Sequence, residues 1–274
     1  DTMKVALIQM QNVQDKQTNL DKAEALIREA ASGGADLCVL PEMFCCEYRN
    51  RAFVENQEPV GGPAWSMLSR AAAENGVWLI GGSIPETAED GKIYNTSFVF
   101  NREGKQTGRC RKVHLFDINV EGGQHFKESA TFTPGDEICV LDTEFGRLGL
   151  CICFDIRFPE LARIMALDGA WAVICPASFN MTTGPAHWEI LFRCRAVDNQ
   201  IYMLGCAPAR DEQGFYVSYS NSIVVSPWGE VLARAGASEE IVYAELEPER
   251  VESVRRQLPL MSARRPDMYT LGRA

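Results

Sequence analysis

Short apolar runs alternate with segments of helical spacing along this chain, and this alternation limits its possible folds more than any other feature. The apolar runs predict buried strands at residues 3–10, 35–42, 77–84, 145–153, 171–177 and 201–207. The segments of helical spacing predict helices at residues 18–34, 63–76, 158–168 and 185–199. Thr18 and Asp21 form a predicted capping box at the start of the first helix. Strands followed by helices in this way favour crossover units in an α/β sheet.

Strand pairs joined by tight turns are also predicted. Segment 93–115 contains the turn Asn101–Gly104, and segment 216–234 contains the turn SPWGE, ahead of a last strand near residues 240–246. Hairpins and crossover units together indicate two mixed sheets. Because no repeat, charge block or Pro/Gly/Ser-rich linker divides the chain, we expect a single α/β domain over residues 3–274.

The net negative charge of the chain argues against two classes of binding partner, nucleic acids and anionic membranes. The formal net charge is −10 at pH 7. A broad nucleic-acid or anionic-membrane surface needs an excess of basic residues, so neither is expected. No apolar run approaches the length of a membrane span, and no charged segment precedes an apolar leader. We therefore expect neither a membrane span nor a signal peptide.

The chain has ten cysteines, which raises the question of disulfides or a metal site. Several of them, including Cys38, Cys175 and Cys206, lie inside apolar runs, where a free thiol packs as a small hydrophobe. The cysteine spacing does not match a zinc site, and there are three histidines. The sequence thus favours a reduced, cytoplasmic protein without bound zinc.

The stretch GLCICFDIRFPE, residues 149–160, has the features of a nucleophile site. Cys151 and Cys153 are predicted to point to the same face of one strand, with Cys153 at its carboxyl end and Cys151 deeper in the core. A strand, a cysteine, a tight turn and a helix start near Phe158–Pro159 are the parts of a nucleophile elbow. In that geometry the backbone N–H of Phe154 is free to donate to an oxyanion.

A nucleophilic thiol needs a base and a cationic partner, and two other strand ends offer them. Glu42 closes the apolar run LCVLPE, where burial would raise the pKa of its carboxyl towards that of a useful base. Lys112 closes RCRK ahead of an apolar stretch. His114 keeps a Cys–His dyad open as an alternative, because it would share a strand face with Lys112 if that strand continued.

Glu42, Lys112 and Cys153, in this order at strand ends, resemble the Glu-Lys-Cys triad of the nitrilase superfamily of carbon–nitrogen hydrolases. The segments RKVHLFDI, KESATFTPGD, GLCICFDIRFPELA, FNMTTGPAHWEIL, CRAVDNQ and VVSPWGEVL resemble its omega-amidase branch. The resemblance implies an α-β-β-α sandwich of two mixed sheets flanked by helices, and a homodimer. It also implies a further site carboxylate at Glu128 and neither cofactor nor metal.

The resemblance also implies where a substrate binds. Arg157, predicted at the start of the next helix, would bind the far carboxylate of a short dicarboxylic monoamide, unless it forms a salt bridge with Glu160 or another carboxylate instead. Thr183 and Gly184 precede a helix opened by Pro185, whose free N–H groups suit an anion. Tyr48 matches a pocket tyrosine, although residues 43–53 around it depart from the branch pattern.

The most specific function that these features predict is a cysteine amidohydrolase acting through a thioester. It would release ammonia from a small-molecule amide such as 2-oxoglutaramate or 2-oxosuccinamate. A deaminated-glutathione amidase or an N-carbamoyl-amino-acid hydrolase stays open within the same class. A non-catalytic thiol sensor is the alternative from a different class.

Overall fold

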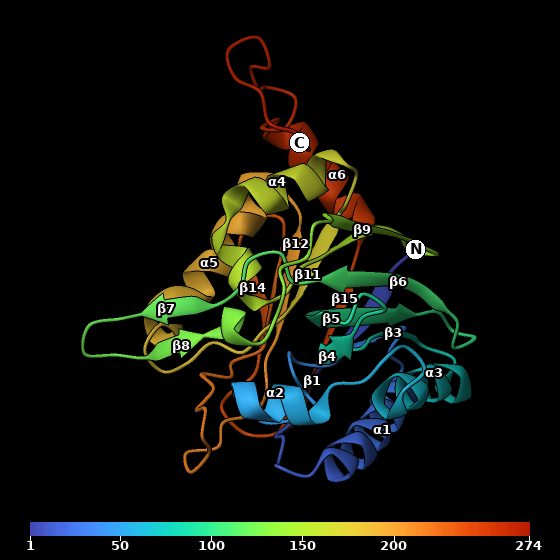
Figure 1. Ribbon diagram of the computed structural model, residues 1–274. Helices are drawn as coiled ribbons and strands as arrows, with labels where there is room; N and C mark the ends of the chain where they lie inside the picture. The colour runs from blue at the N-terminus through green and yellow to red at the C-terminus, as the bar shows by residue number, and fades with distance from the viewer.

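The computed structural model describes residues 1–274 as two mixed β-sheets that pack face to face, with helices on their outer sides (Figure 1). The α-β-β-α sandwich of two mixed sheets is confirmed. Its cause is visible in the alternation of side chains along β1 (Met3–Gln9). Val5 and Leu7 enter the apolar cluster between the sheets, whereas Ala6 and Ile8 enter the cluster under the outer helices. Each central strand is buried on both faces, so its sequence is almost continuously apolar.

The first sheet has seven strands in the order β15-β1-β2-β3-β5-β4, with β6 paired to β5. Besides β1, its strands are β2 (Leu37–Val39), β3 (Trp78–Ile80), β4 (Ile84–Thr87), β5 (Ile93–Phe100), β6 (Gln106–Arg111) and β15 (Glu240–Leu246). Helices α1 (Lys16–Ser32) and α3 (Pro63–Asn75) cover its outer face. The first three strands in sequence run parallel, as crossover units require.

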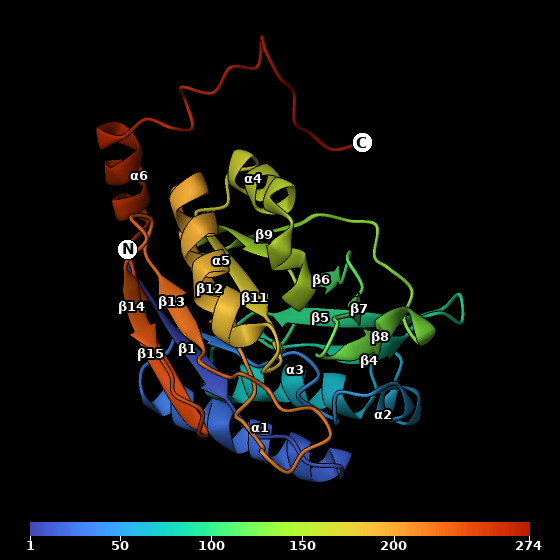
Figure 2. The same ribbon diagram turned by 90° about the vertical axis from the view of Figure 1, so that its left-hand side faces the viewer.

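The second sheet has six strands in the order β14-β13-β12-β11-β10-β9. They are β9 (Cys139–Thr143), β10 (Gly146–Leu150), β11 (Ala172–Pro176), β12 (Tyr202–Cys206), β13 (Ile223–Val225) and β14 (Val231–Arg234). Helices α4 (Pro159–Leu167) and α5 (Gly184–Asn199) cover its outer face, on the side away from α1 and α3 (Figure 2). Figure 2 also shows the chain after α6 (Pro248–Gln257) running away from the sheets.

Several local predictions are wrong. Thr18 is not the cap of the first helix, because α1 already begins at Lys16 and the Asp15 carboxylate accepts a hydrogen bond from the Thr18 N–H (2.8 Å). The strand predicted at 77–84 is split into β3 and β4, because Gly82 turns the chain with a φ of +57°. Residues 216–222 hold no named strand, so the predicted hairpin is limited to β13 and β14.

Some helices and strands had no sequence prediction. They are helix α2 (Asn50–Asn56), the small hairpin of β7 (Asp117–Asn119) and β8 (His125–Lys127), strand β9 and helix α6. The hairpin and α2 lie around the end of the sandwich that contains the candidate site (Figure 1). None of the helices combines the length and the apolar character that crossing a membrane would require.

Candidate active site

The four candidate catalytic side chains lie at the ends of elements from both sheets, and all four are buried. Glu42 follows β2 and Lys112 directly follows β6, whereas Glu128 begins the short 3₁₀ turn η1 (Glu128–Ala130). Cys153 begins a second turn, η2 (Cys153–Arg157), after β10. Their exposed fractions are at most 3%. The packing of one sheet on the other therefore brings together residues that are distant in sequence.

Lys112 is the centre of this cluster. Its Nζ donates to Glu42 Oε1 (2.9 Å) and to Glu128 Oε2 (2.8 Å), and it lies 3.5 Å from the Tyr48 hydroxyl. Burial alone would lower the pKa of Lys112, but the two carboxylates outweigh burial and hold that pKa well above its usual value. The ammonium group stays charged and can stabilise a neighbouring negative charge.

Glu42 has the properties of a proton acceptor. Burial raises the pKa of its carboxyl, and Glu128 adds to this effect, while Lys112 and the Cys153 thiol oppose it. Its Oε2 atom is buried without a hydrogen-bond partner. A carboxylate with a raised pKa and one unoccupied oxygen beside a thiol is suited to general base catalysis.

Cys153 occupies a strained backbone position. Its φ is +46°, a left-handed value that costs a non-glycine residue about 1–3 kcal/mol and is found most often at functional sites. The Ser178 N–H donates to its sulfur (3.4 Å). Burial, followed by the charge of Glu42, raises the pKa of the thiol well above its usual value. The thiol therefore rests protonated and needs a base before it can attack.

The strand before Cys153 and the turn and helix after it agree with the predicted nucleophile elbow. However, β10 ends earlier than predicted. Because β10 stops at Leu150, the expectation that Cys151 and Cys153 share one strand face is wrong. In η2 the first bond within the turn runs from the Asp155 N–H to the Ile152 carbonyl (3.1 Å). The N–H of Phe154 comes before that bond, at the start of the turn, where donors have no partner within the turn. It is therefore a candidate oxyanion donor.

Asp155 holds this turn in place and also engages His114. Its Oδ2 accepts from the Ile152 N–H (3.0 Å), and its Oδ1 accepts from the His114 N–H (2.9 Å) and contacts His114 Nδ1 (2.8 Å). The His114 ring stacks on Phe158 at 3.6 Å. The strand does not continue to His114, because β6 ends at Arg111, so His114 and Lys112 share no strand face. These contacts direct His114 to Asp155 and not to Cys153.

Arg157 lies in the same small pocket as Cys153. This pocket is lined by Phe116, Cys153, Phe154, Arg157, Ser178, Phe179 and Thr183. Arg157 is the last residue of η2 and precedes α4, so its prediction as a helix start is wrong. Its Nη1 lies 3.1 Å from His187 Nδ1, and its guanidinium lies over the Phe179 ring at 4.8 Å. No salt bridge joins it to Glu160, so the guanidinium is available to an anion.

The start of α5 contributes less than predicted. The N–H groups of Thr183 and Gly184 both donate to Asn180, and those of Ala186 and His187 donate to the Thr183 carbonyl. The prediction of free N–H groups at this helix start is therefore wrong. Gly184 is instead required by packing, because a Cβ there would lie 2.3 Å from the Tyr219 side chain. Thr183 remains on the pocket wall.

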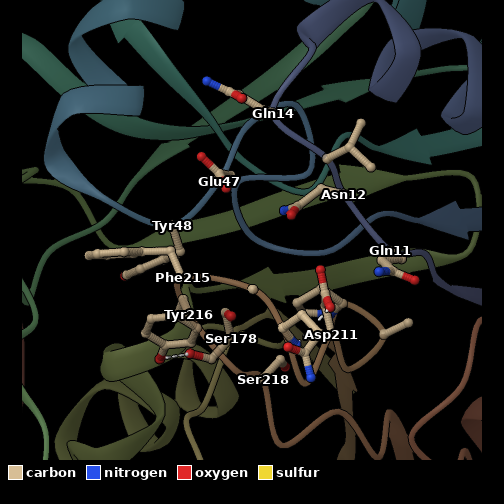
Figure 3. A pocket seen from close by; sticks show the side chains of 15 residues that line it. Gln11, Asn12, Gln14, Glu47, Tyr48, Ser178, Asp211, Phe215, Tyr216 and Ser218 are labelled. Atoms are coloured by element: carbon tan, nitrogen blue, oxygen red, sulfur yellow. Dashed lines mark hydrogen bonds between the residues drawn. The ribbon is translucent and has the colours of Figure 1, made fainter.

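Tyr48 links the catalytic cluster to a larger cavity. Its hydroxyl donates to Glu42 Oε1 (3.2 Å), and its ring packs against Tyr216 at 4.6 Å. On the other side of these rings lies a cavity of about 230 Å³ (Figure 3). Figure 3 shows Tyr216 bonded to Ser178, which lines both this cavity and the pocket of Cys153.

Two residues of the site were not identified from the sequence. Ser178 follows β11, as the other site residues follow strands, but nothing in its local pattern marks it. Asn95 lies inside β5 and donates to Glu42 Oε1 (3.0 Å) and Glu128 Oε1 (2.9 Å). Its signal was the polar run Asn95-Thr96-Ser97 inside an apolar strand, all of it buried. A polar run in a strand without an exposed face indicates a buried polar site.

No group of three or more His, Cys, Asp and Glu side chains is arranged to hold a metal ion. The cationic centre next to the thiol is Lys112.

Comparisons with known proteins show the family of this chain. The family model of carbon–nitrogen hydrolases matches residues 4–256. The omega-amidase NIT2 of Bos taurus is 48% identical over 98% of this chain and 97% of its own length. The crystal structure of Saccharomyces cerevisiae Nit3, a member of branch 10 of the nitrilase superfamily, superposes with a TM-score of 0.89 at 43% identity, covering 96% of this chain and 97% of that one.

A third similar protein is the amidase of Nesterenkonia sp. AN1. A mutant of it with the acetamide moiety of fluoroacetamide covalently added at the active site cysteine has a TM-score of 0.77 and 26% identity. That match covers 97% of this chain and 95% of the amidase.

Proposed function

Because this chain belongs to the carbon–nitrogen hydrolase family and is an amide-hydrolysing enzyme, we propose that it is an omega-amidase. Its substrate would be a short dicarboxylic monoamide, such as 2-oxoglutaramate or 2-oxosuccinamate, and its products the 2-oxo diacid and ammonia. The observation that carries the proposal is a pocket holding both a thiol with a catalytic cluster and an arginine that has no carboxylate partner.

In the proposed acylation step, Glu42 takes the proton of the Cys153 thiol while the sulfur attacks the amide carbon. The new carbon–sulfur bond moves an electron pair onto the carbonyl oxygen, which the Lys112 ammonium and the Phe154 N–H stabilise. When the carbon–nitrogen bond breaks, Glu42 returns the proton to the nitrogen, and ammonia leaves. A thioester on Cys153 remains.

Water completes the cycle. Glu42 removes a proton from a water molecule, whose oxygen attacks the thioester carbon. The carbon–sulfur bond then breaks, the sulfur recovers a proton from Glu42, and the acid is released. The covalent adduct on the active site cysteine of the Nesterenkonia amidase supports a covalent route through Cys153. Glu128 takes part through Lys112, whose charge it maintains.

We propose that Arg157 and Thr183 bind the far carboxylate of the substrate, while Tyr48 borders its acyl chain. Burial lowers the pKa of Arg157, but a guanidinium remains charged at any physiological pH. An ion that is partly removed from water and has no carboxylate partner gains from binding an anionic ligand. This selects an amide that carries a free acid.

The remaining proposals concern the whole protein. We propose a single catalytic domain over residues 3–274, because the apolar cluster between the sheets draws on strands from both halves of the chain. A cytoplasmic location is proposed because all ten cysteines are free thiols. A homodimer is proposed on the resemblance to the superfamily.

The test is a substrate panel with ammonia release as the readout. We expect 2-oxoglutaramate to be preferred over its methyl ester by about 10–150-fold in kcat/KM, the value of one charge-assisted contact. Arg157→Lys should remove most of that preference, mainly through KM, because an ammonium cannot reproduce the planar fork. Equal rates for acid and ester would contradict the proposed substrate class. Turnover of an N-carbamoyl amino acid alone would point to the alternative hydrolase.

A further inference from the structure

Three donors converge on one oxygen of Glu42. Lys112 Nζ (2.9 Å), Asn95 Nδ2 (3.0 Å) and the Tyr48 hydroxyl (3.2 Å) all bond to Oε1. The other oxygen, Oε2, is buried and has no hydrogen-bond partner. A carboxylate whose lone pairs are engaged on one oxygen takes a proton on the other one, because protonating the engaged oxygen would displace a donor.

Glu128 differs from Glu42 in this respect. Its Oε1 accepts from Asn95 Nδ2 (2.9 Å), and its Oε2 accepts from Lys112 Nζ (2.8 Å) and the Phe116 N–H (2.7 Å). Both oxygens are engaged, so neither is as free to take a proton as Oε2 of Glu42. Two carboxylates beside one lysine therefore have different capacities for proton transfer.

Asn95 is the neutral side chain that contacts both carboxylates. It is 1% exposed and lies inside β5, and its two Nδ2 hydrogens serve one carboxylate each. The opposite orientation of the amide would set Oδ1 against two carboxylate oxygens, so the partners fix which end faces them. Its Oδ1 is buried without a partner. The contacts of this amide with the site are therefore made by its N–H groups and not by its carbonyl oxygen.

We infer that Asn95 is a positioning residue that makes Oε2 of Glu42 the oxygen that takes the Cys153 proton. The inference rests on the proposed role of Glu42 as the base. By donating to both carboxylates, Asn95 favours their ionised forms, and its amide lies between the two negative charges. Without the N–H groups of Asn95, Oε1 of Glu42 loses a hydrogen-bond donor, and the Glu42 carboxyl holds its proton more tightly. Proton transfer is then no longer directed to Oε2.

Other charged or titratable groups also face Glu42, and the test must leave them in place. They come from the end of β6, from η1 and η2, and from the loops after β2 and β12. These groups are Lys112, Glu128, Cys153, Tyr48 and Tyr216. Only Asn95 is changed.

The experiment measures two rates against pH in Asn95→Leu. One is ammonia release from 2-oxoglutaramate, and the other is alkylation of Cys153 by iodoacetamide, located by mass spectrometry. Leucine has the same branched shape but donates no hydrogen bond. We expect both rates at pH 6 to fall about tenfold or more and to recover as the pH rises. The midpoint of the acid limb should move up by about one to two pH units, with KM little changed.

Asn95→Asp provides the second variant, and circular dichroism checks that each variant is folded. A protonated Asp can still donate one hydrogen bond, whereas an ionised Asp adds a third negative charge to the cluster. The added charge raises the pKa of Glu42 further, so the acid limb of Asn95→Asp should lie at least as high as that of Asn95→Leu. Ser97→Ala is the matched control, because Ser97 is equally buried two residues along β5 and its hydroxyl has no partner. Its profile should equal that of the parent.

An unchanged acid limb in Asn95→Leu, or a loss of rate that is equal at every pH, would overturn the inference. The same holds if Asn95→Asp keeps the acid limb of the parent. Failure of the proposed function has a different signature, because the parent enzyme would then release no ammonia from the amide. The alkylation profiles would still report on Asn95 in that case.

Discussion

The thiol of Cys153 differs from the activated cysteines that carry a resting thiolate. Burial and the neighbouring Glu42 raise its pKa, and the opposing effects of Lys112 and the Ser178 N–H do not compensate. A neutral thiol in a buried site is protected from oxidants, which react with thiolates. It becomes a nucleophile only when a substrate carbonyl and the base are both in place. The proton transfer and the attack are thus coupled at this residue.

The two cysteines of the elbow should respond differently to substitution. Cys153→Ala should abolish turnover and leave the fold intact, because the nucleophile is lost. Cys151→Ala should keep most activity and lose about 1–2 kcal/mol of unfolding free energy for a lost buried sulfur. Turnover assays and urea unfolding of both variants check this. An acyl adduct found on Cys151 by mass spectrometry would contradict the assignment.

The base can be tested through pH. Because burial raises the pKa of Glu42, kcat/KM should rise with pH through a limb above the usual range for a glutamate, as the carboxyl loses its proton. Glu42→Gln should remove that limb and slow single-turnover acylation by about 10²–10⁴-fold with folding nearly unchanged. His114→Asn is the control, and its effect should be mild because His114 contacts Asp155. The reverse ranking would favour a Cys–His enzyme.

At the scale of elements, strand ends explain which site residues could be predicted. Glu42 and Cys153 each follow an apolar run and Lys112 closes a strand, so the rule that reactive groups collect at strand ends made them candidates. The resemblance to the nitrilase superfamily then selected all three as catalysts. Glu128 was identified only by resemblance, because its burial depends on the packing of η1 under distant strands. The break at Gly82 and the early end of β10 were missed, because apolar composition continues where the backbone conformation changes.

The corner between β3 and β4 should control the position of Glu42. At Gly82, with a φ of +57°, an added Cβ would lie 2.1 Å from the carbonyl oxygen of Pro41, which immediately precedes Glu42. The neighbouring Ser83 hydroxyl accepts from the Met43 N–H (3.0 Å). Gly82→Ala must therefore shift the backbone on which Glu42 sits. A displacement of about 1 Å can cost about 10²-fold in rate, and we expect a loss of kcat of that order.

Gly91→Ala is the control for this substitution. Gly91 also has a left-handed φ, of +80°, but an added Cβ there meets nothing within 4 Å. It should cost only the conformational penalty, about 1–2 kcal/mol of unfolding free energy, without a change in kcat. Equal kcat values in Gly82→Ala and the parent would show that the corner does not position Glu42.

At the scale of the whole molecule, the site exists only because the two sheets pack together. Glu42 and Lys112 follow strands of the first sheet, whereas Cys153 and Ser178 follow strands of the second. The apolar cluster between the sheets therefore sets the separation of base and nucleophile. The clusters under the outer helices instead pack each helix layer on its own sheet. A truncation between the sheets should therefore affect both the unfolding free energy and the acylation rate. A truncation under an outer helix should affect mainly the unfolding free energy.

Leu204→Ala and Ile27→Ala test this separation. Both side chains are fully buried, Leu204 between the sheets and Ile27 on the inner face of α1. Each truncation should lower the unfolding free energy by about 2–5 kcal/mol, which urea titration measures. Only the cavity left by Leu204→Ala lets one sheet move against the other. Single-turnover acylation at a temperature where both variants are folded should therefore fall about tenfold or more in Leu204→Ala and stay near the parent rate in Ile27→Ala. Equal acylation rates in the two variants would mean that the intersheet cluster stabilises the fold without setting the geometry of the site.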